Sequence, residues 1–175
     1  GSFDGLHRGH QELIRGVRTS RDRLGLDSGA LFTFMQHPRQ LLDPRSEPFL
    51  LTTWRAKLAL LQELECQDIV AADFCPELSR LSYEEFVDRF LGGYLGMKRL
   101  VAAYDIHLGA DRRGTAATLE ELGHTLGYTV EVIPPVKAGT DIISSSAIRK
   151  ALAVGDLSRA ADMLGRPYAI WGEVT

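Results

Sequence analysis

The chain opens with the stretch Gly1-Ser2-Phe3-Asp4-Gly5-Leu6-His7-Arg8-Gly9-His10. Its first five residues are typical of the turn that leaves a strand, and a helix is predicted to follow over about Arg8–Leu24. The two histidines are one helical turn apart, so their side chains point the same way. The glycine between them lets a phosphate approach the backbone, and the free N–H groups of a helix start favour anions. This strand–turn–helix stretch therefore predicts a phosphate site in an α/β fold.

Two other interpretations of this stretch stay open. Histidines three residues apart also occur as metal ligands, and so short a motif also occurs by chance in solvated loops. Beside Asp4 no third metal ligand stands out, so no metal site is predicted. The favoured hypothesis is a phosphate site in which His7 and His10 stabilise charge that develops on a phosphoryl group.

Short apolar runs alternate with helical patterns along the rest of the chain. The predicted strands are Ala30–Phe34, Asp68–Ala72, Arg99–Ala103 and Thr129–Ile133. The further predicted helices are about Thr53–Leu64, a helix from the capping box Ser82-Tyr83-Glu84-Glu85 to Gly92-Gly93, and about Thr115–Leu126. Apolar strands separated by helices imply a parallel sheet that is covered on both faces, which is an α/β fold.

Periodicity also predicts which residues are buried and which stretches are loops. The inward residues of the first two helices are predicted to be Leu13, Ile14, Val17 and Leu24, and Trp54, Leu58 and Leu61. The longest irregular stretches are expected at Met35–Leu51 and Pro134–Ile143. No strand precedes the opening turn, so the first strand of the sheet is expected to be missing from this sequence. Residues Tyr168–Thr175 are expected to be extended and to begin a second domain.

A second group of polar residues lies in Ile143-Ser144-Ser145-Ser146-Ala147-Ile148-Arg149. Hydroxyls at a helix start are ordinary capping residues. Ser145, Ser146 and Arg149 are equally suited to binding phosphate oxygens together with the exposed N–H groups, because a guanidinium makes a two-pronged contact with an oxyanion. The residues alone leave both interpretations open.

Composition limits the class of protein. The chain has 175 residues, 45% of them apolar, and a formal net charge of −3, which argues against broad binding of a nucleic acid backbone. Its two cysteines, Cys66 and Cys75, form no CxxC pair, so a disulfide or zinc scaffold is not expected. No apolar run reaches the roughly 20 residues that span a membrane, and no signal peptide is expected. A cytoplasmic protein that binds neither nucleic acid nor membranes is therefore expected.

The motifs, in their order along the chain, resemble those of bacterial bifunctional riboflavin kinase/FMN adenylyltransferases. The opening stretch resembles the G-[NST]-F-D-G-x-H-x-G-H motif of that family, and residues 143–149 resemble its I-S-S-T-x-I-R motif. Thr33-Phe34 with His37-Pro38-Arg39 is similar to T-F-x-P-H-P-R, and Asp105 with Gly109 falls in its G-x-D-F-x-F-G loop. Leu164-Gly165-Arg166-Pro167-Tyr168, followed by Gly172-Glu173-Val174, resembles the L-G-R-P-Y junction between the two domains of the family.

The resemblance implies a fold and a division into domains. The expected fold is a doubly wound, Rossmann-like parallel sheet of the HxGH nucleotidyltransferase type with strand order 3-2-1-4-5. In this order the His7 motif follows strand one and Asp105 follows strand four, so both loops would meet at the crevice where ligands bind. Residues 1–165 would form the FMN adenylyltransferase domain, and residues 166–175 would start a truncated riboflavin kinase domain.

The resemblance also implies an activity, its substrates and its site. The enzyme would transfer the adenylyl group of ATP, with Mg²⁺ on the ATP phosphates, to FMN, and so form FAD and pyrophosphate; the parent protein would also phosphorylate riboflavin. The implied catalytic residues are His7, His10, Ser145 and Arg149. The implied ATP-binding residues are Gly1, Phe3, Asp4, Gly9, His10, Asp105, Ser144, Ser145, Ser146 and Arg149. The implied flavin-binding residues are His37, Pro38, Leu42, Asp105 and Leu108.

Departures from the family pattern gather on the flavin side. Aliphatic residues at Leu42, Ile106 and Leu108 stand where the family has aromatic ones, and Asp111 adds negative charge. Adenylyl transfer to another phosphorylated acceptor is therefore an alternative. A non-catalytic nucleotide-binding domain and a metal-dependent hydrolase are further alternatives outside this reaction class.

Overall fold

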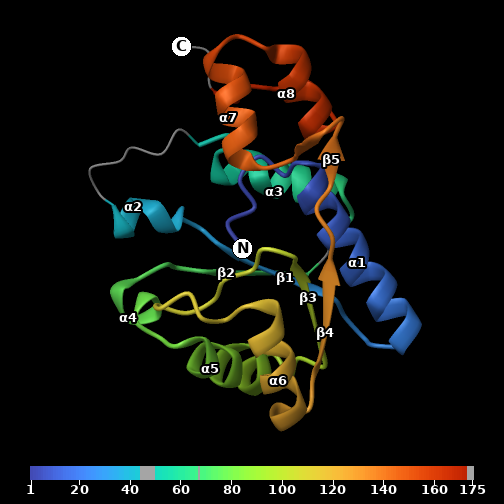
Figure 1. Cartoon of the computed structure of the whole chain (residues 1–175), viewed down its shortest axis with the longest axis vertical. Helices are drawn as coiled ribbons and strands as arrows, with labels where there is room; N and C mark the ends of the chain where they lie inside the picture. Colours follow the sequence, from blue (N-terminus) through green and yellow to red (C-terminus); the bar gives the residue numbers. More distant parts are fainter. Residues whose placement is uncertain (44–49, 67, 173–175) are drawn as a thin grey trace. The chain divides into compact units, whose positions relative to one another are not determined.

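The computed structural model describes residues 1–43, 50–66 and 68–172 (Figure 1). Its first long element is α1 (Arg8–Leu24), which begins where the side chain of His7 accepts a hydrogen bond from the N–H of His10. The helix ends at Gly25, whose φ of 62° lies in the left-handed region that favours glycine. The predicted bounds of this helix are confirmed.

The chain divides into two compact units, Gly1–Asp73 with Pro135–Thr175, and Phe74–Pro134. In the first unit, β1 (Ala30–Phe34) pairs in parallel with β2 (Asp68–Ala72) (Figure 1). Two helices, α2 (Pro38–Leu42) and α3 (Trp54–Glu63), lie between these strands in the sequence. The opening residues, α1, β1 and α3 share one hydrophobic cluster, which consists of Phe3, Leu6, Ile14, Leu31, Leu60 and Leu61.

Two predictions about buried faces are wrong. Leu24 is 43% exposed and Leu58 is 37% exposed, although both were expected to face inward. Leu24 is the last residue of α1. Periodicity shows which face of a helix is apolar, but it does not show how far along the helix the neighbouring elements cover that face. In α3 the buried face includes Lys57, because its ammonium reaches backbone carbonyls that apolar periodicity does not reveal.

The first unit also contains the C-terminal helices. A short antiparallel pair, β5 (Lys137–Ala138) and β6 (Asp141–Ile142), precedes α7 (Ser145–Ala153) and α8 (Leu157–Leu164). The two helices pack on each other (Figure 1). The second hydrophobic cluster consists of Leu51, Ile143, Ile148, Ala151, Ala160, Met163 and Leu164. Residues 165–172, which follow α8, form no helix or strand, and Glu173-Val174 of the junction motif lies outside the described residues.

The second unit has a parallel pair of its own, β3 (Arg99–Ala103) and β4 (Thr129–Ile133). Its helices are α4 (Pro76–Ser79), α5 (Tyr83–Phe86), the π-helix η1 (Val87–Tyr94) and α6 (Ala116–Leu126). The predicted helix end at Gly92-Gly93 is wrong, since η1 continues through both glycines to Tyr94. Gly96, with a φ of 60°, takes the left-handed conformation two residues after the helix ends.

The structure is thus mixed α/β, with one parallel two-stranded pair in each unit. All predicted strand bounds are confirmed. The two stretches expected to be irregular contain α2 and the β5–β6 pair, because short elements of two to five residues leave no periodic signal. No helix among the described residues is long and apolar enough to cross a membrane.

Candidate active site

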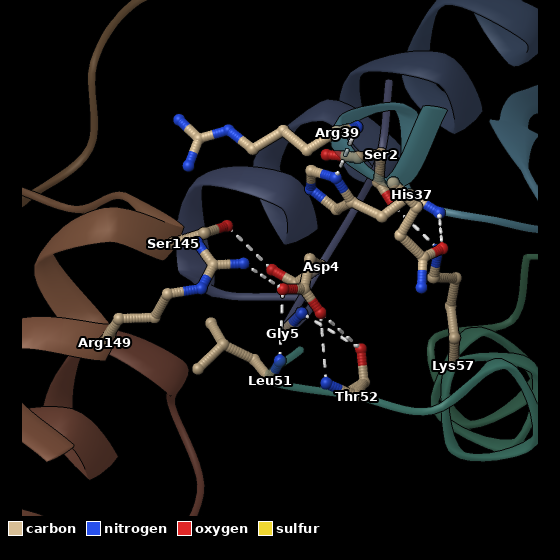
Figure 2. A network of polar contacts seen from close by, with 11 residues as sticks. Ser2, Asp4, Gly5, His37, Arg39, Leu51, Thr52, Lys57, Ser145 and Arg149 are labelled. Atoms are coloured by element: carbon tan, nitrogen blue, oxygen red, sulfur yellow. Dashed lines mark hydrogen bonds and ion pairs between the residues drawn. The ribbon is translucent and has the colours of Figure 1, made fainter. Parts of the chain in front are cut away.

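The opening stretch is organised around the buried carboxylate of Asp4, which is 2% exposed (Figure 2). Its two oxygens accept hydrogen bonds from the backbone N–H of Leu51 at 3.1 Å, from the N–H of Thr52 at 3.0 Å and from the Thr52 hydroxyl at 3.1 Å. Arg149 of α7 also pairs with this carboxylate. The carboxylate therefore joins three segments that are far apart in the sequence.

The backbone of this turn is held in an uncommon conformation. Phe3 and Leu6 have φ values of 47° and 42°, in the left-handed region that non-glycine residues rarely adopt. The side-chain amide of Gln11 donates to the carbonyl of Leu6 at 3.0 Å, and the guanidinium of Arg166 donates to the carbonyl of Gly5 at 2.7 Å. Such strain persists where surrounding contacts over-determine it, and it is frequent at functional sites.

The two imidazoles of the opening motif stack on each other. The ring centroids of His7 and His10 are 3.6 Å apart with an interplanar angle of 17°, and the Phe3 ring is 4.9 Å from that of His10. His7 Nδ1 accepts from the N–H of His10 at 3.3 Å, so a neutral His7 ring carries its proton on Nε2. A Cβ at Gly9 would lie 3.2 Å from two atoms of the His7 ring, so any side chain there would press on that ring.

His10 is held in its neutral form. Burial lowers its pKa well below the usual value, and the neighbouring His7 and Lys57 act in the same direction. Its Nδ1 atom is buried and finds no hydrogen-bond partner among the described residues. A neutral imidazole still offers one N–H donor and one acceptor, so it can bind a phosphate oxygen without a full charge.

The three serines at the start of α7 take different roles. Ser144 caps the helix by accepting from the N–H of Ala147 at 3.2 Å. The Ser145 hydroxyl donates to the backbone carbonyl of Asp4 at 2.8 Å (Figure 2). Ser146 is exposed. Of the three serine hydroxyls, that of Ser146 is the one available, together with the helix N–H groups, to donate to a bound anion.

Lys57, which no sequence motif indicated, contacts the opening stretch through its side chain. Its ammonium donates to the carbonyl of Ser2 at 2.7 Å and lies 3.5 Å from the carbonyl of Phe34. It also lies 5.4 Å from the centre of the Trp54 ring. Burial lowers its pKa, while Asp4 acts in the opposite direction. The sequence did contain a signal that Lys57 is buried: it lies on the same face of α3 as the apolar residues Leu60 and Leu61.

The residues described so far form what we call the phosphate-side cluster: residues 1–10, Leu51, Thr52, Lys57 and residues 144–149. The contact between Ser145 and Asp4 brings together two motifs that are 141 residues apart in the chain. Sequence reasoning also missed Thr52, and it missed Gln11 and Arg166, which hold the opening turn from outside the cluster. Arg166 belongs to the L-G-R-P-Y motif, so its position was singled out although its contact with the opening turn was not.

A second group, residues 37–42, carries three of the side chains predicted to bind the flavin and is called here the flavin-side segment for that prediction alone. His37 begins α2 and accepts from the N–H of Arg39 at 3.2 Å, while its own N–H donates to Gln40 at 3.1 Å. Burial lowers the pKa of His37, and Asp4 acts in the opposite direction. No residue of α2, Pro38 included, is buried, and Leu42 is 64% exposed.

The remaining predicted site residues, Asp105 and Leu108, lie in the second unit. The side chain of Asp105 is exposed, and its carbonyl is 2.9 Å from Nδ1 of His107. Leu108 is half-buried and exchanges two 3.0 Å backbone hydrogen bonds with Gly114. Gly109 has a φ of 82°, and a Cβ there would lie 2.5 Å from the N atom of Tyr83. Glycine is therefore required at this point of the loop.

Comparisons with known proteins give a consistent family. A family model described as FAD synthetase matches residues 1–147. Bifunctional riboflavin kinase/FMN adenylyltransferases from Pseudomonas fluorescens and Haemophilus influenzae are 35% and 33% identical over 99% of this chain. The matched part is 55% and 56% of those proteins, so the chain spans about half the length of these curated relatives.

One solved structure also resembles this fold. It is described as the crystal structure of a macrolide-efflux protein from Streptococcus pneumoniae and matches with a TM-score of 0.82 and 28% sequence identity. The match covers 96% of this chain and 54% of that protein.

Proposed function

This chain belongs to the FAD synthetase family, and on that premise we propose that it transfers the adenylyl group of ATP to FMN. The family resemblance drawn from the sequence motifs is confirmed. The observation that carries the proposal is the contact between the two motifs expected to bind phosphate: Ser145 at the start of α7 donates to Asp4 in the opening loop. Two helix starts, each with free N–H groups, contribute to the phosphate-side cluster.

The reaction forms one phosphorus–oxygen bond and breaks another. An oxygen of the FMN phosphate attacks the α-phosphorus of ATP, the bond to the bridging oxygen of the β-phosphate breaks, and pyrophosphate leaves with that electron pair. No protein nucleophile is needed, so catalysis rests on positioning and on stabilising the charge of the transition state. Preformed donors suit this task, because they need little reorganisation when the charge develops.

The proposed catalytic groups are His7, His10, Ser145 and Arg149. The neutral His10 ring would donate its N–H to a phosphate oxygen, and His7 would do so through Nε2. The Arg149 guanidinium would bind the pyrophosphate side. The proposed ATP contacts further include the backbone at Gly1, Phe3 and Gly9, the start of α7 at Ser144 to Ser146, and Asp105 at the nucleotide end.

The flavin would bind at the flavin-side segment, with His37, Pro38 and Leu42, and at Asp105 and Leu108. The aliphatic Leu42 is 64% exposed, so it is available to a ring but offers no aromatic stacking. Adenylyl transfer to a different phosphorylated acceptor is the second candidate function, favoured by the aliphatic residues on this side.

Magnesium would arrive on the phosphates of ATP. In the part of the chain that the structure describes, no three side chains of His, Cys, Asp or Glu come together as a metal cage. Both Asp4 oxygens already accept hydrogen bonds from the protein. This donor set fits an ion that is held mainly by substrate phosphates and water. When bound, the ion would offset negative charge on the phosphates.

We also propose the finer architecture and domain division. The doubly wound, Rossmann-like sheet of the HxGH type is supported by the two parallel pairs and by Gly1, whose N atom donates to the carbonyl of Phe32 in β1 at 3.0 Å. Residues 1–165 would be the adenylyltransferase domain, and residues 166–175 would begin the riboflavin kinase domain that the names of the curated relatives include. The parent protein would then also phosphorylate riboflavin.

The test is a product analysis. The full-length protein is incubated with ATP, magnesium and FMN, and in parallel with a panel of other phosphorylated acceptors, and new dinucleotides are identified by mass. FAD and pyrophosphate in equal amounts are the expected products. A folded protein that adenylylates another acceptor and makes no FAD would establish the second candidate. If no acceptor is adenylylated, adenylyl transfer is wrong, and the alternative of a non-catalytic nucleotide-binding domain takes its place.

A further inference from the structure

The carboxylate of Asp4 is fully engaged by the protein itself. It accepts from two backbone N–H groups and one hydroxyl, at 3.0 to 3.1 Å, and it pairs with Arg149. An ionised carboxylate is a pure acceptor, so it has no donor to offer to a phosphate oxygen. Like charge would also oppose a polyphosphate in direct contact with it. These contacts indicate that the Asp4 carboxylate fixes the positions of the protein groups around it and does not bind the substrate.

The neighbours that Asp4 organises are groups already assigned to the reaction. Its carboxylate pairs with the Arg149 guanidinium, and its backbone carbonyl accepts from the Ser145 hydroxyl at 2.8 Å. Thr52 supports the arrangement twice, because its hydroxyl donates to the Asp4 carboxylate and accepts from the N–H of Gly5, both at 3.1 Å. Figure 2 shows these groups converging on Asp4 from three segments.

We propose that Asp4, supported by Thr52, is a positioning residue whose carboxylate orients Arg149 for the transfer step. This inference rests on the proposed adenylyl transfer and replaces the direct ATP contact that the motif resemblance implied for Asp4. The carboxylate partly offsets the charge of Arg149, so it contributes nothing to simple electrostatic attraction of ATP. The carboxylate acts by restricting the long side chain of Arg149 to one position before substrate binds, so less conformational entropy is lost when the guanidinium contacts the substrate.

The experiment measures pyrophosphate release, kcat and the KM for ATP in the full-length protein. Asp4→Asn keeps the size of the side chain but removes the charge that pairs with Arg149, and it puts an NH2 donor where one of the two oxygens accepts a backbone N–H. We expect kcat to fall by about 10²-fold, as misplaced reacting groups commonly produce, while the KM for ATP changes by less than about threefold. A normal kcat, or a loss confined to KM, would overturn the positioning role.

A double-mutant cycle separates positioning from general damage. If Asp4 acts through Arg149, the Asp4→Asn change should lower kcat by less than about threefold further in an Arg149→Lys background. Fully additive losses would contradict the proposal. Thr52→Val is the gentler variant, since it leaves both charged groups in place; it should lower kcat by about fivefold, and Thr52→Ser should recover most of that loss. Equal losses in the two Thr52 variants would count against the hydroxyl.

The matched control is Asp141→Asn. Asp141 pairs with Arg159, the same two side-chain types, but the side chains are 52% and 54% exposed and neither lies in the phosphate-side cluster. This variant should leave kcat and KM unchanged. Urea unfolding of every variant shows whether it is folded under assay conditions. Wild-type protein that releases no pyrophosphate with any acceptor would overturn the proposed function itself, whereas an active wild type with an active Asp4→Asn variant would overturn only the role of Asp4.

Discussion

The phosphate-side cluster and the flavin-side segment differ in how far the protein has already ordered them. In the first, Asp4 and His7 are 2% and 7% exposed, and contacts from α7 and from residues 51–52 hold the loop. In the second, α2 has no buried residue. Groups that stabilise charge work best when they are rigid before substrate arrives. If residues 37–42 bind the flat ring of a flavin as proposed, that surface would tolerate more change, because dispersion and burial have little directionality.

The largest expected effect lies in the cluster. His10→Ala should lower kcat by about 10²-fold or more, with a smaller effect on ATP affinity, if the ring stabilises transition-state charge. Steady-state kinetics with ATP as the varied substrate measures both. His124→Ala, at an exposed position of α6, is the control and should leave both constants unchanged. A loss confined to ATP affinity would reassign His10 to ground-state binding.

The next effect concerns the support beneath the cluster. Lys57→Met removes the donor to the Ser2 carbonyl and leaves that acceptor without its 2.7 Å partner. We expect the free energy of unfolding to fall by about 1–2 kcal/mol, because the Ser2 carbonyl is partly buried and loses its donor. Urea unfolding measures it, with the exposed Lys150→Met as control. Equal midpoints for the two variants would show that the Lys57 contact contributes little.

A smaller effect is expected from pH. The pKa of His10 is lowered in the folded state, so below about pH 6.5 the unfolded chain takes up a proton that the folded chain does not. The free energy of unfolding should therefore fall with decreasing pH, by at most about 1.4 kcal/mol per pH unit from this group. Urea midpoints measured at pH 7.5 and 5.5 give the change in stability with pH for each variant. His10→Asn should show a smaller change than the wild type, because the His10 contribution is gone, whereas His124→Asn should show the wild-type change. An unchanged slope in His10→Asn would mean that folding does not lower the pKa of His10.

The smallest effect tests the flavin-side segment. Leu42→Phe restores a ring at a position that is 64% exposed, and an aromatic partner adds roughly 0.5–1.5 kcal/mol beyond burial, so FMN should bind about threefold to tenfold tighter. Titration of FMN measures this, and ATP affinity should stay the same. Leu157→Phe, at a 61% exposed position in α8, is the control. Unchanged or weaker FMN binding would show that Leu42 does not face the flavin.

The positions of the main helices and strands could be predicted from the sequence because their signals are local. The bounds of α1 follow from the histidine start and from Gly25, and the strands follow from short apolar runs. The π-helical turn through Gly92-Gly93 could not be predicted, since glycines there accommodate a wider turn as readily as they end a helix. Short elements such as β5 and β6 are also below the length at which periodicity is informative.

The sequence by itself determined which chemical groups the site contains: two histidines, a serine-rich helix start and an arginine, each within a short motif. Only the tertiary structure decided how they are coupled. Asp4 meets Arg149, Thr52 meets Asp4, and Lys57 reaches Ser2 through contacts between residues 48 to 145 positions apart. Spacing along a chain records neighbours within a turn or a strand, whereas a buried carboxylate selects its partners from whatever segments the packed core brings within hydrogen-bond distance.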